Sequence, residues 1–129
     1  MKNEGFSWKR RMRSFRYAFN GIRLLVGGEA NARIHCVAAA CAVTAGICLD
    51  ISRLEWIAVT FAIGMVLAAE AVNSAIEALA DRVSPEYDEA IKRTKDLAAG
   101  AVLLLAIAAA VVGLIIFLPK LVSAYTLYF

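Results

Sequence analysis

The sequence is poor in charge and in residues that break helices. Only 19% of its 129 residues are charged, against about 25% in a typical soluble domain, and only two are proline. Hydrophobic residues make up 61% of the chain. Because a short chain has a large surface for its volume, a soluble fold would need more polar residues to cover it. The composition excludes most soluble folds and favours an all-α integral membrane protein.

Several motifs of well-known chemistry are missing. The chain has no GxxxxGK[ST] phosphate-binding loop, no kinase glycine-rich loop and no GxSxG nucleophile motif. Its three cysteines lack CxxC spacing, which argues against a zinc site or a disulfide framework, and we interpret Cys36, Cys41 and Cys48 as small buried or lipid-facing residues. The single histidine, His35, lies near a predicted membrane end, where we favour a structural, hydrogen-bonded role.

Basic residues are concentrated near the N-terminus. Residues 1–23 hold seven of the fourteen lysine and arginine side chains and a single acid. Nucleic-acid binding is one use of such a segment, but the apolar remainder of the chain favours attraction to an anionic membrane leaflet. Apolar residues recur there at helical spacing: Phe15, Phe19, Ile22 and Val26. This pattern predicts an amphipathic helix at the membrane surface that ends at Gly27-Gly28.

Three apolar segments follow, and a helix needs about 20 residues to cross roughly 30 Å of hydrocarbon. We predict one membrane domain with a surface helix at 5–28, spans at 30–50, 55–81 and 95–118, and a cytoplasmic linker at 82–94. The first span is short and relies on flanking polar side chains that reach the interface. The third ends at Pro119-Lys120. Within the linker, Ser84 is the predicted N-cap of a helical stretch, with Pro85 at its first position.

Lysine and arginine also predict the orientation. If the N-terminus is cytoplasmic, twelve basic residues lie on that side and only Arg53 and Lys120 lie on the other. This bias obeys the positive-inside rule. The acids of the second span then lie at or near the cytoplasmic interface.

A polar stripe runs along the end of the second predicted span. Its members are Glu70, Asn73, Ser74, Glu77 and Asp81. At about 100° per residue they fall within roughly a 100° arc of the helix. A carboxylate inside a membrane costs at least about 2.5 kcal/mol, so such residues usually face a protein interior or a water-filled site. The alternative is that this segment has left the bilayer and the stripe is a solvated face.

The stripe carries the oxygen ligands that suit Mg²⁺, which one or two carboxylates and substrate phosphates often hold. This chemistry favours phosphoryl transfer over zinc hydrolysis. Glu29, before the first span, could add a further carboxylate on the same side. Lys95 opens the third span there, where it either binds a phosphate or anchors the helix at the interface.

The segment from Glu70 to Asp81, EAVNSAIEALAD, resembles the signature of the prokaryotic diacylglycerol kinase family, E-x-x-N-[ST]-A-I-E-x-x-x-D. Lys95-Asp96 with the following AAGAV is similar to the second motif of that family. The resemblance extends over nearly the whole chain. The segments from Glu29 to His35 and from Val112 to Lys120 are more similar to its undecaprenol kinase branch.

The resemblance implies an ATP-dependent lipid kinase in a bacterial cytoplasmic (inner) membrane. It implies a homotrimer of three-span subunits with active sites shared between neighbours at the cytoplasmic face. Mg²⁺ is the implied cofactor and ATP the co-substrate. The implied acceptor is the hydroxyl of a membrane lipid alcohol, undecaprenol or diacylglycerol, and the sequence leaves open which. No nucleic-acid partner is implied.

The resemblance also implies a role for each matching residue. Glu70 is the implied base that takes the proton from the lipid hydroxyl, and Glu29 and Glu77 are the implied metal ligands. The implied nucleotide-binding residues are Arg10, Tyr17, Arg23, Glu29, Glu77, Lys95 and Asp96. The implied supporting residues are Asn73, Ser74 and Asp81. Asp88 stands where many members have histidine, so no adenine-binding role is assigned to it.

A second function from another class stays open at this point. A small membrane assembly or cation-relay protein could use Glu70 and Glu77 to pass cations. Such a relay has little use for a phosphate-matching Lys95 beside a metal-binding set that includes Glu29. These two residues therefore favour the kinase.

Overall fold

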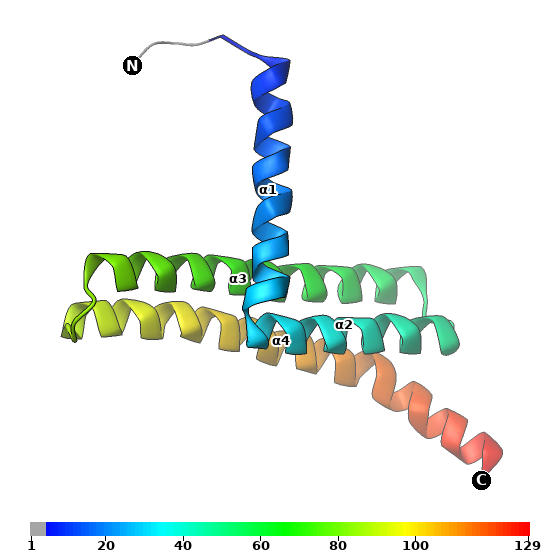
Figure 1. Ribbon diagram of the computed structural model, residues 1–129. Helices are drawn as coiled ribbons and strands as arrows, with labels where there is room; N and C mark the ends of the chain where they lie inside the picture. Colours follow the sequence, from blue (N-terminus) through cyan, green and yellow to red (C-terminus); the bar gives the residue numbers. More distant parts are fainter. Residues whose placement is uncertain (1–4) are drawn as a thin grey trace.

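The computed structural model describes residues 5–129, and nearly all of that range is helical (Figure 1). The helices in chain order are α1 (Trp8–Gly28), α2 (Ala30–Cys48), α3 (Arg53–Val83) and α4 (Glu89–Tyr128). No strand occurs among the described residues, which confirms the predicted all-α class. Lys2 and Glu4 of the basic N-terminal segment lie outside this range.

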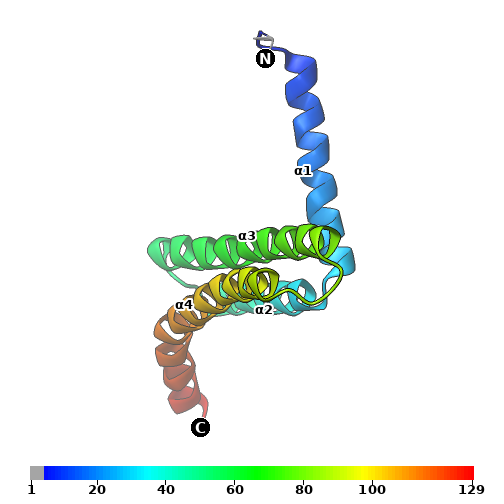
Figure 2. The same ribbon diagram turned by 90° about the vertical axis from the view of Figure 1, so that its left-hand side faces the viewer.

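Helices α2, α3 and α4 lie side by side, and α1 stands across them (Figures 1 and 2). Helix α1 leaves the bundle beside the middle of α3, and α2 begins at that same level and runs along the half of α3 that starts at Arg53. The second half of α3 and the first half of α4 extend past α1 as a helical hairpin. The polar stripe begins where α1, α2 and α3 meet and continues along this hairpin.

Helices α2, α3 and α4 are each long and apolar enough to cross a membrane, in agreement with three predicted spans. At about 1.5 Å per residue, the 19 residues of α2 just match the roughly 30 Å of hydrocarbon. Helices α3 and α4 have 31 and 40 residues, so their ends must extend beyond the hydrocarbon. The limits of the spans within these two helices stay predictions.

The turn between α2 and α3 is fixed by local interactions. Asp50 adopts a left-handed backbone with φ of 51°, which reverses the chain in few residues. Ser52 then caps α3: its hydroxyl accepts from the Glu55 amide at 3.2 Å, and its own amide donates to the Glu55 carboxylate at 3.0 Å. This reciprocal capping box satisfies two amides that have no partner inside the helix.

The prediction that Ser84 caps a helix is wrong. Ser84 follows the end of α3, where its amide donates to the Ala80 carbonyl, and Asp88 is the cap, accepting from the Ile91 amide at 3.1 Å. Aspartate caps a helix as well as serine does. The negative charge of Glu89 in the first turn also interacts favourably with the positive end of the helix dipole. Helix α4 therefore begins inside the segment predicted as linker.

Helix α4 also continues past the predicted end at Pro119-Lys120 and reaches Tyr128. A proline inside a helix removes one backbone hydrogen bond and bends the axis without necessarily ending the helix. Figure 1 shows the last part of α4 turning away from α3. Lys120 lies 3.3 Å from the Glu55 carboxylate, so an ion pair ties this bend to the start of α3.

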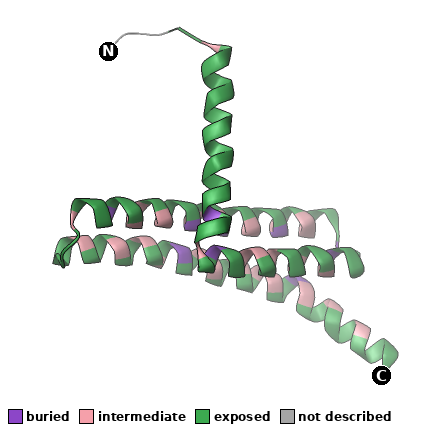
Figure 3. Cartoon of the chain, in the orientation of Figure 1, coloured by how far each residue is buried: buried purple, intermediate pink, exposed green. Residues whose placement is uncertain are grey.

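Few of the described residues are buried (Figure 3). A small core lies at the end of the bundle opposite the hairpin and consists of Ile51, Val59 and Ile116, with Trp56 packed against it. Large apolar side chains along α2, α3 and α4 are otherwise mostly exposed. This surface suits hydrocarbon or other copies of the chain better than water.

Gly46 provides a stability prediction, because an added Cβ would lie 2.8 Å from the Trp56 ring and 3.0 Å from Ile51 Cδ1. We expect Gly46→Ala to lower the free energy of unfolding by about 1–3 kcal/mol through overpacking. Gly64→Ala is the matched control, since no atom lies within 4 Å of its added Cβ. Thermal unfolding in detergent, followed by circular dichroism, measures both. Equal stability of the two variants would contradict the close packing at Gly46.

Candidate active site

The polar stripe begins at a residue that faces the interior of the helix bundle. Glu70 is only 4% exposed and is the one buried charged residue among those the structure describes. Its Oε1 lies 3.2 Å from Nε2 of His35 on α2. The alternative in which the whole stripe is a solvated face is therefore wrong at Glu70. A solvated face occurs only toward the end of α3, where Asp81 is exposed.

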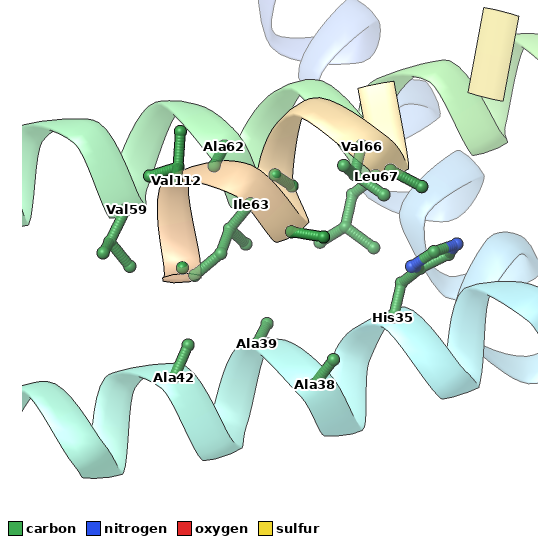
Figure 4. A pocket seen from close by; sticks show the side chains of 14 residues that line it. His35, Ala38, Ala39, Ala42, Val59, Ala62, Ile63, Val66, Leu67 and Val112 are labelled. Carbon is green, nitrogen blue, oxygen red and sulfur yellow. The ribbon is translucent and has the colours of Figure 1, made fainter. Parts of the chain in front are cut away.

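His35 thus has the polar partner that its predicted structural role requires. Its ring stands at one end of a cavity of about 240 Å³ between α2, α3 and α4 (Figure 4). The other lining residues are apolar and mostly small, among them Ala38, Ala39 and Val66. His35, which contacts Glu70, therefore forms the polar end of this apolar cavity.

Lys95 links the far part of the stripe to α4. Its Nζ donates to the Asp81 carboxylate at 2.6 Å, and the negative charge of Glu77 acts on it as well. Lys95 therefore faces carboxylates of α3 and not only the interface. Phosphate oxygens have the same sign of charge and the same hydrogen-bonding capacity as these carboxylate oxygens, and the phosphate-binding role of Lys95 stays a prediction.

Asp96 has a different environment from its neighbour Lys95. Its carboxylate accepts from Lys92 at 2.6 Å, one turn earlier on α4, and both side chains are largely exposed. Such surface pairs contribute only about 0–1 kcal/mol, so Lys92 can release Asp96 at little cost. The ion pair of Asp96 is thus with its own helix and not with the α3 stripe.

Asn73 carries an unpaired acceptor. Its Oδ1 is buried and has no hydrogen-bond partner within residues 5–129, and the residue lines a cleft between α3 and α4. A buried acceptor without a partner costs about 1–3 kcal/mol. A ligand or another copy of the chain would remove this cost by supplying the missing partner.

Glu29 is placed by the junction of α1 and α2. It is the extended residue between the two helices, and it is half-buried beside the last turns of α1. It lines a cleft of about 690 Å³ together with Ser74 of α3 and apolar residues such as Leu25 and Ala71. The fold therefore brings Glu29 to the α3 stripe from a distant part of the sequence.

The oxygen donors fit Mg²⁺ in chemistry, but the fold gathers only some of them in one place. No three Asp, Glu, His or Cys side chains form a metal site in the part of the chain that the structure describes. Glu29 lies on the α1 side of α3, and Glu77 lies near Lys95 on the α4 side. Carboxylates with the unpaired Asn73 oxygen are nevertheless the hard ligands that Mg²⁺ takes, and it commonly completes its shell with phosphates and water.

The remaining predicted nucleotide ligands lie on α1. Arg10 and Tyr17 belong to the part of α1 that extends away from the bundle, and Leu25 near its end is the buried residue of that helix (Figure 1). Arg23 donates to Asn20 on its own helix at 3.3 Å. Neither Arg10 nor Tyr17 is among the residues that line the cleft with Ser74, and their nucleotide role stays a prediction.

Sequence reasoning missed two contacts of the site, Glu70 with His35 and Asp81 with Lys95. The partners lie on different helices, and their pairing depends on how those helices pack. For Glu70 one signal was available: a carboxylate buried in an apolar helix requires a polar partner, and His35 is one of the few polar residues in the preceding span. For Asp81, which is exposed, that argument does not apply.

The chain is similar in sequence to known proteins over most of its length. The family model described as prokaryotic diacylglycerol kinase matches residues 16–117. The undecaprenol kinase of Bacillus subtilis is 36% identical over 109 residues, which cover 84% of this chain and 89% of that protein. The diacylglycerol kinase of Escherichia coli is 32% identical over 111 residues, covering 86% and 91%. A Synechocystis diacylglycerol kinase is 38% identical over 111 residues, covering 85% of this chain but 63% of the longer relative.

The matched region contains the whole polar stripe, Glu29, His35 and the Lys95-Asp96 pair, and it includes α2 and α3 completely. The match is long, and two of the named relatives match along about nine tenths of their own length. A chance resemblance of a single motif is therefore excluded. This chain belongs to the prokaryotic diacylglycerol kinase family.

Proposed function

We propose that this protein transfers the γ-phosphoryl group of Mg-ATP to the hydroxyl of a membrane lipid alcohol, at the cytoplasmic face of a bacterial inner membrane. Its family and its named relatives are lipid kinases, and this chain is one of them. That membership decides between the two functions left open by the sequence, in favour of the kinase over the cation relay. The finer statements below are proposals.

The observation that carries the mechanism is the buried Glu70 carboxylate on a membrane-spanning helix. A lipid alcohol cannot leave the bilayer easily, so its hydroxyl must meet ATP at the membrane edge. Glu70 takes the proton from that hydroxyl as the oxygen attacks the γ-phosphorus. The bond from the γ-phosphorus to the bridging oxygen of ADP breaks, and a phosphate monoester of the lipid forms.

The other residues of the stripe neutralise and orient the phosphates. Lys95 exchanges its Asp81 contact for phosphate oxygens, and Asp96 contacts the nucleotide after release from Lys92. Glu29 and Glu77, with Asn73 beside them, would hold Mg²⁺, which when bound offsets the negative charge of the phosphates. Ser74 and Asp81 support this arrangement from the same face of α3. The oxygen chemistry of these side chains and the unpaired Asn73 acceptor support the assignment.

A homotrimer with shared sites accounts for what one subunit leaves incomplete. Arg10 and Tyr17 belong to the part of α1 that stands away from the bundle, and most large apolar side chains are exposed. If α2, α3 and α4 cross the bilayer, α1 runs along its surface, where Phe15 and Phe19 can enter the lipid while arginines face the phosphates. From there α1 can reach the site of a neighbouring subunit.

The proposed acceptor is undecaprenol, with diacylglycerol as the alternative. The segments around Glu29 and Val112 favour the undecaprenol kinase branch, and relatives of both names match the chain. The test supplies radiolabelled ATP and Mg²⁺ to the protein in mixed micelles, with undecaprenol and diacylglycerol in parallel. We expect labelled lipid, with faster labelling of undecaprenol. An absence of label on both alcohols, and on other lipid alcohols, would refute the proposed function.

A further inference from the structure

We infer that His35 positions the Glu70 carboxylate for proton transfer, and thereby acts on the rate of the transfer step and not on the affinity for either substrate. The inference rests on the proposed function of Glu70 as the base. His35 is a positioning residue in this assignment, since it acts through Glu70 and not on the lipid or the nucleotide.

The contact joins two helices at the level where the stripe begins. His35 Nε2 on α2 and Glu70 Oε1 on α3 are 3.2 Å apart, and the side chains are 26% and 5% exposed. Because Glu70 is so strongly buried, water has little access to compete with His35 for its carboxylate. The Asp81–Lys95 pair is more exposed, so water competes with its partners more readily.

The surroundings of His35 strengthen this reading. Figure 4 shows the ring at one end of the cavity, with Ala38, Ala39 and Ala42 following it along α2. Among the lining residues of that cavity, His35 is the one polar side chain. The ring therefore has Glu70 as its polar neighbour on the α3 side.

The chemistry of a general base requires this kind of restraint. The last torsion of a glutamate side chain is broad, so a carboxylate without a partner samples many orientations. A base must come within about 2.6–3.2 Å of the hydroxyl that it deprotonates, and misplacing a reacting group by about 1 Å can cost roughly 100-fold in rate. An imidazole nitrogen that holds Oε1 leaves Oε2 available for the lipid hydroxyl.

Two substitutions test the role. We expect His35→Phe, which keeps a planar ring but removes the nitrogens, to lower kcat by roughly 10- to 100-fold, with KM for ATP and for the lipid changed less than about threefold. His35→Gln keeps an N–H donor and should recover part of the lost kcat. Val37→Leu, on an exposed face of α2, is the control. If His35→Phe fails to fold, His35→Gln compared with His35→Leu provides the same comparison.

A double-mutant cycle separates positioning from general stabilisation of the fold. Glu70→Asp shortens the side chain by one methylene group and withdraws the carboxylate from His35. We expect His35→Phe to lower kcat less than about threefold in the Glu70→Asp background, because coupled residues do not contribute independently. A loss of the same size in both backgrounds, or a His35→Phe enzyme with unchanged kcat, would overturn the inference.

Glu70→Gln, measured in the same assay, separates a failure of the positioning role of His35 from a failure of the proposed base Glu70. If Glu70→Gln is inactive while His35→Phe retains full kcat, only the positioning role fails. If Glu70→Gln retains near-full turnover, the proposed base fails, and the inference about His35 fails with it.

Discussion

Replacing Glu70 by glutamine is expected to lower lipid phosphorylation by roughly 10²- to 10⁴-fold, the range that general base catalysis contributes. Glutamine has the size of glutamate and fits the buried position, but its neutral amide cannot take the proton of the lipid hydroxyl. ATP affinity should be nearly unchanged, because the base acts on the lipid. Turnover of labelled ATP in mixed micelles and nucleotide binding by titration calorimetry measure the two effects separately.

A matched control is Glu86→Gln in the connection between α3 and α4, where the side chain is exposed. The same chemical change there should leave turnover at the level of the unmodified protein. Near-normal turnover of Glu70→Gln would remove Glu70 from the role of base. Loss of ATP binding in that variant would instead point to a nucleotide-binding role for Glu70.

Replacing Glu77 by alanine is expected to weaken binding of Mg-ATP by roughly 10- to 100-fold, as loss of a metal-site ligand or its supporting partner commonly does. The physical reason is the loss of one oxygen ligand beside Lys95, where the charge of Glu77 already acts. Titration of a non-hydrolysable ATP analogue, at several Mg²⁺ concentrations, measures the change.

Dependence on Mg²⁺ distinguishes Glu77 from Glu70. Excess Mg²⁺ should restore part of the turnover of Glu77→Ala, because a weaker site can still be filled by mass action. It should not restore Glu70→Gln, which lacks a proton acceptor. Unchanged affinity for the Mg-nucleotide in Glu77→Ala would contradict the assignment of Glu77 as a metal ligand.

Sequence signals for helix ends and membrane spans predicted the helices well where a single signal was present. Gly27-Gly28 marks the end of α1, and three apolar segments became three long helices. Prediction failed where two signals compete. Ser84 and Asp88 are both good caps four residues apart, and the structure uses Asp88. Pro119 is a stop signal in the sequence, yet α4 continues through it to Tyr128, and the last part of the helix turns away from α3.

The candidate site was predicted in its residue types and only partly in its arrangement. The offsets along one helix place Glu70, Glu77 and Asp81 on one face, since the angle between helical residues is fixed. Partners on other helices are not fixed by such offsets. That is why Glu70 with His35, and Asp81 with Lys95, were found only in three dimensions.

By itself, the sequence determined the all-α membrane character, the polar stripe and the family. These follow from composition, helical periodicity and the motif from Glu70 to Asp81, which are all properties of neighbouring residues. Only the tertiary structure decided that Glu70 is buried against His35, that Lys95 turns to Asp81, and that α1 keeps Arg10 away from its own stripe. The packing of helices joined by short turns sets these distances, and that packing depends on contacts between residues far apart in the chain.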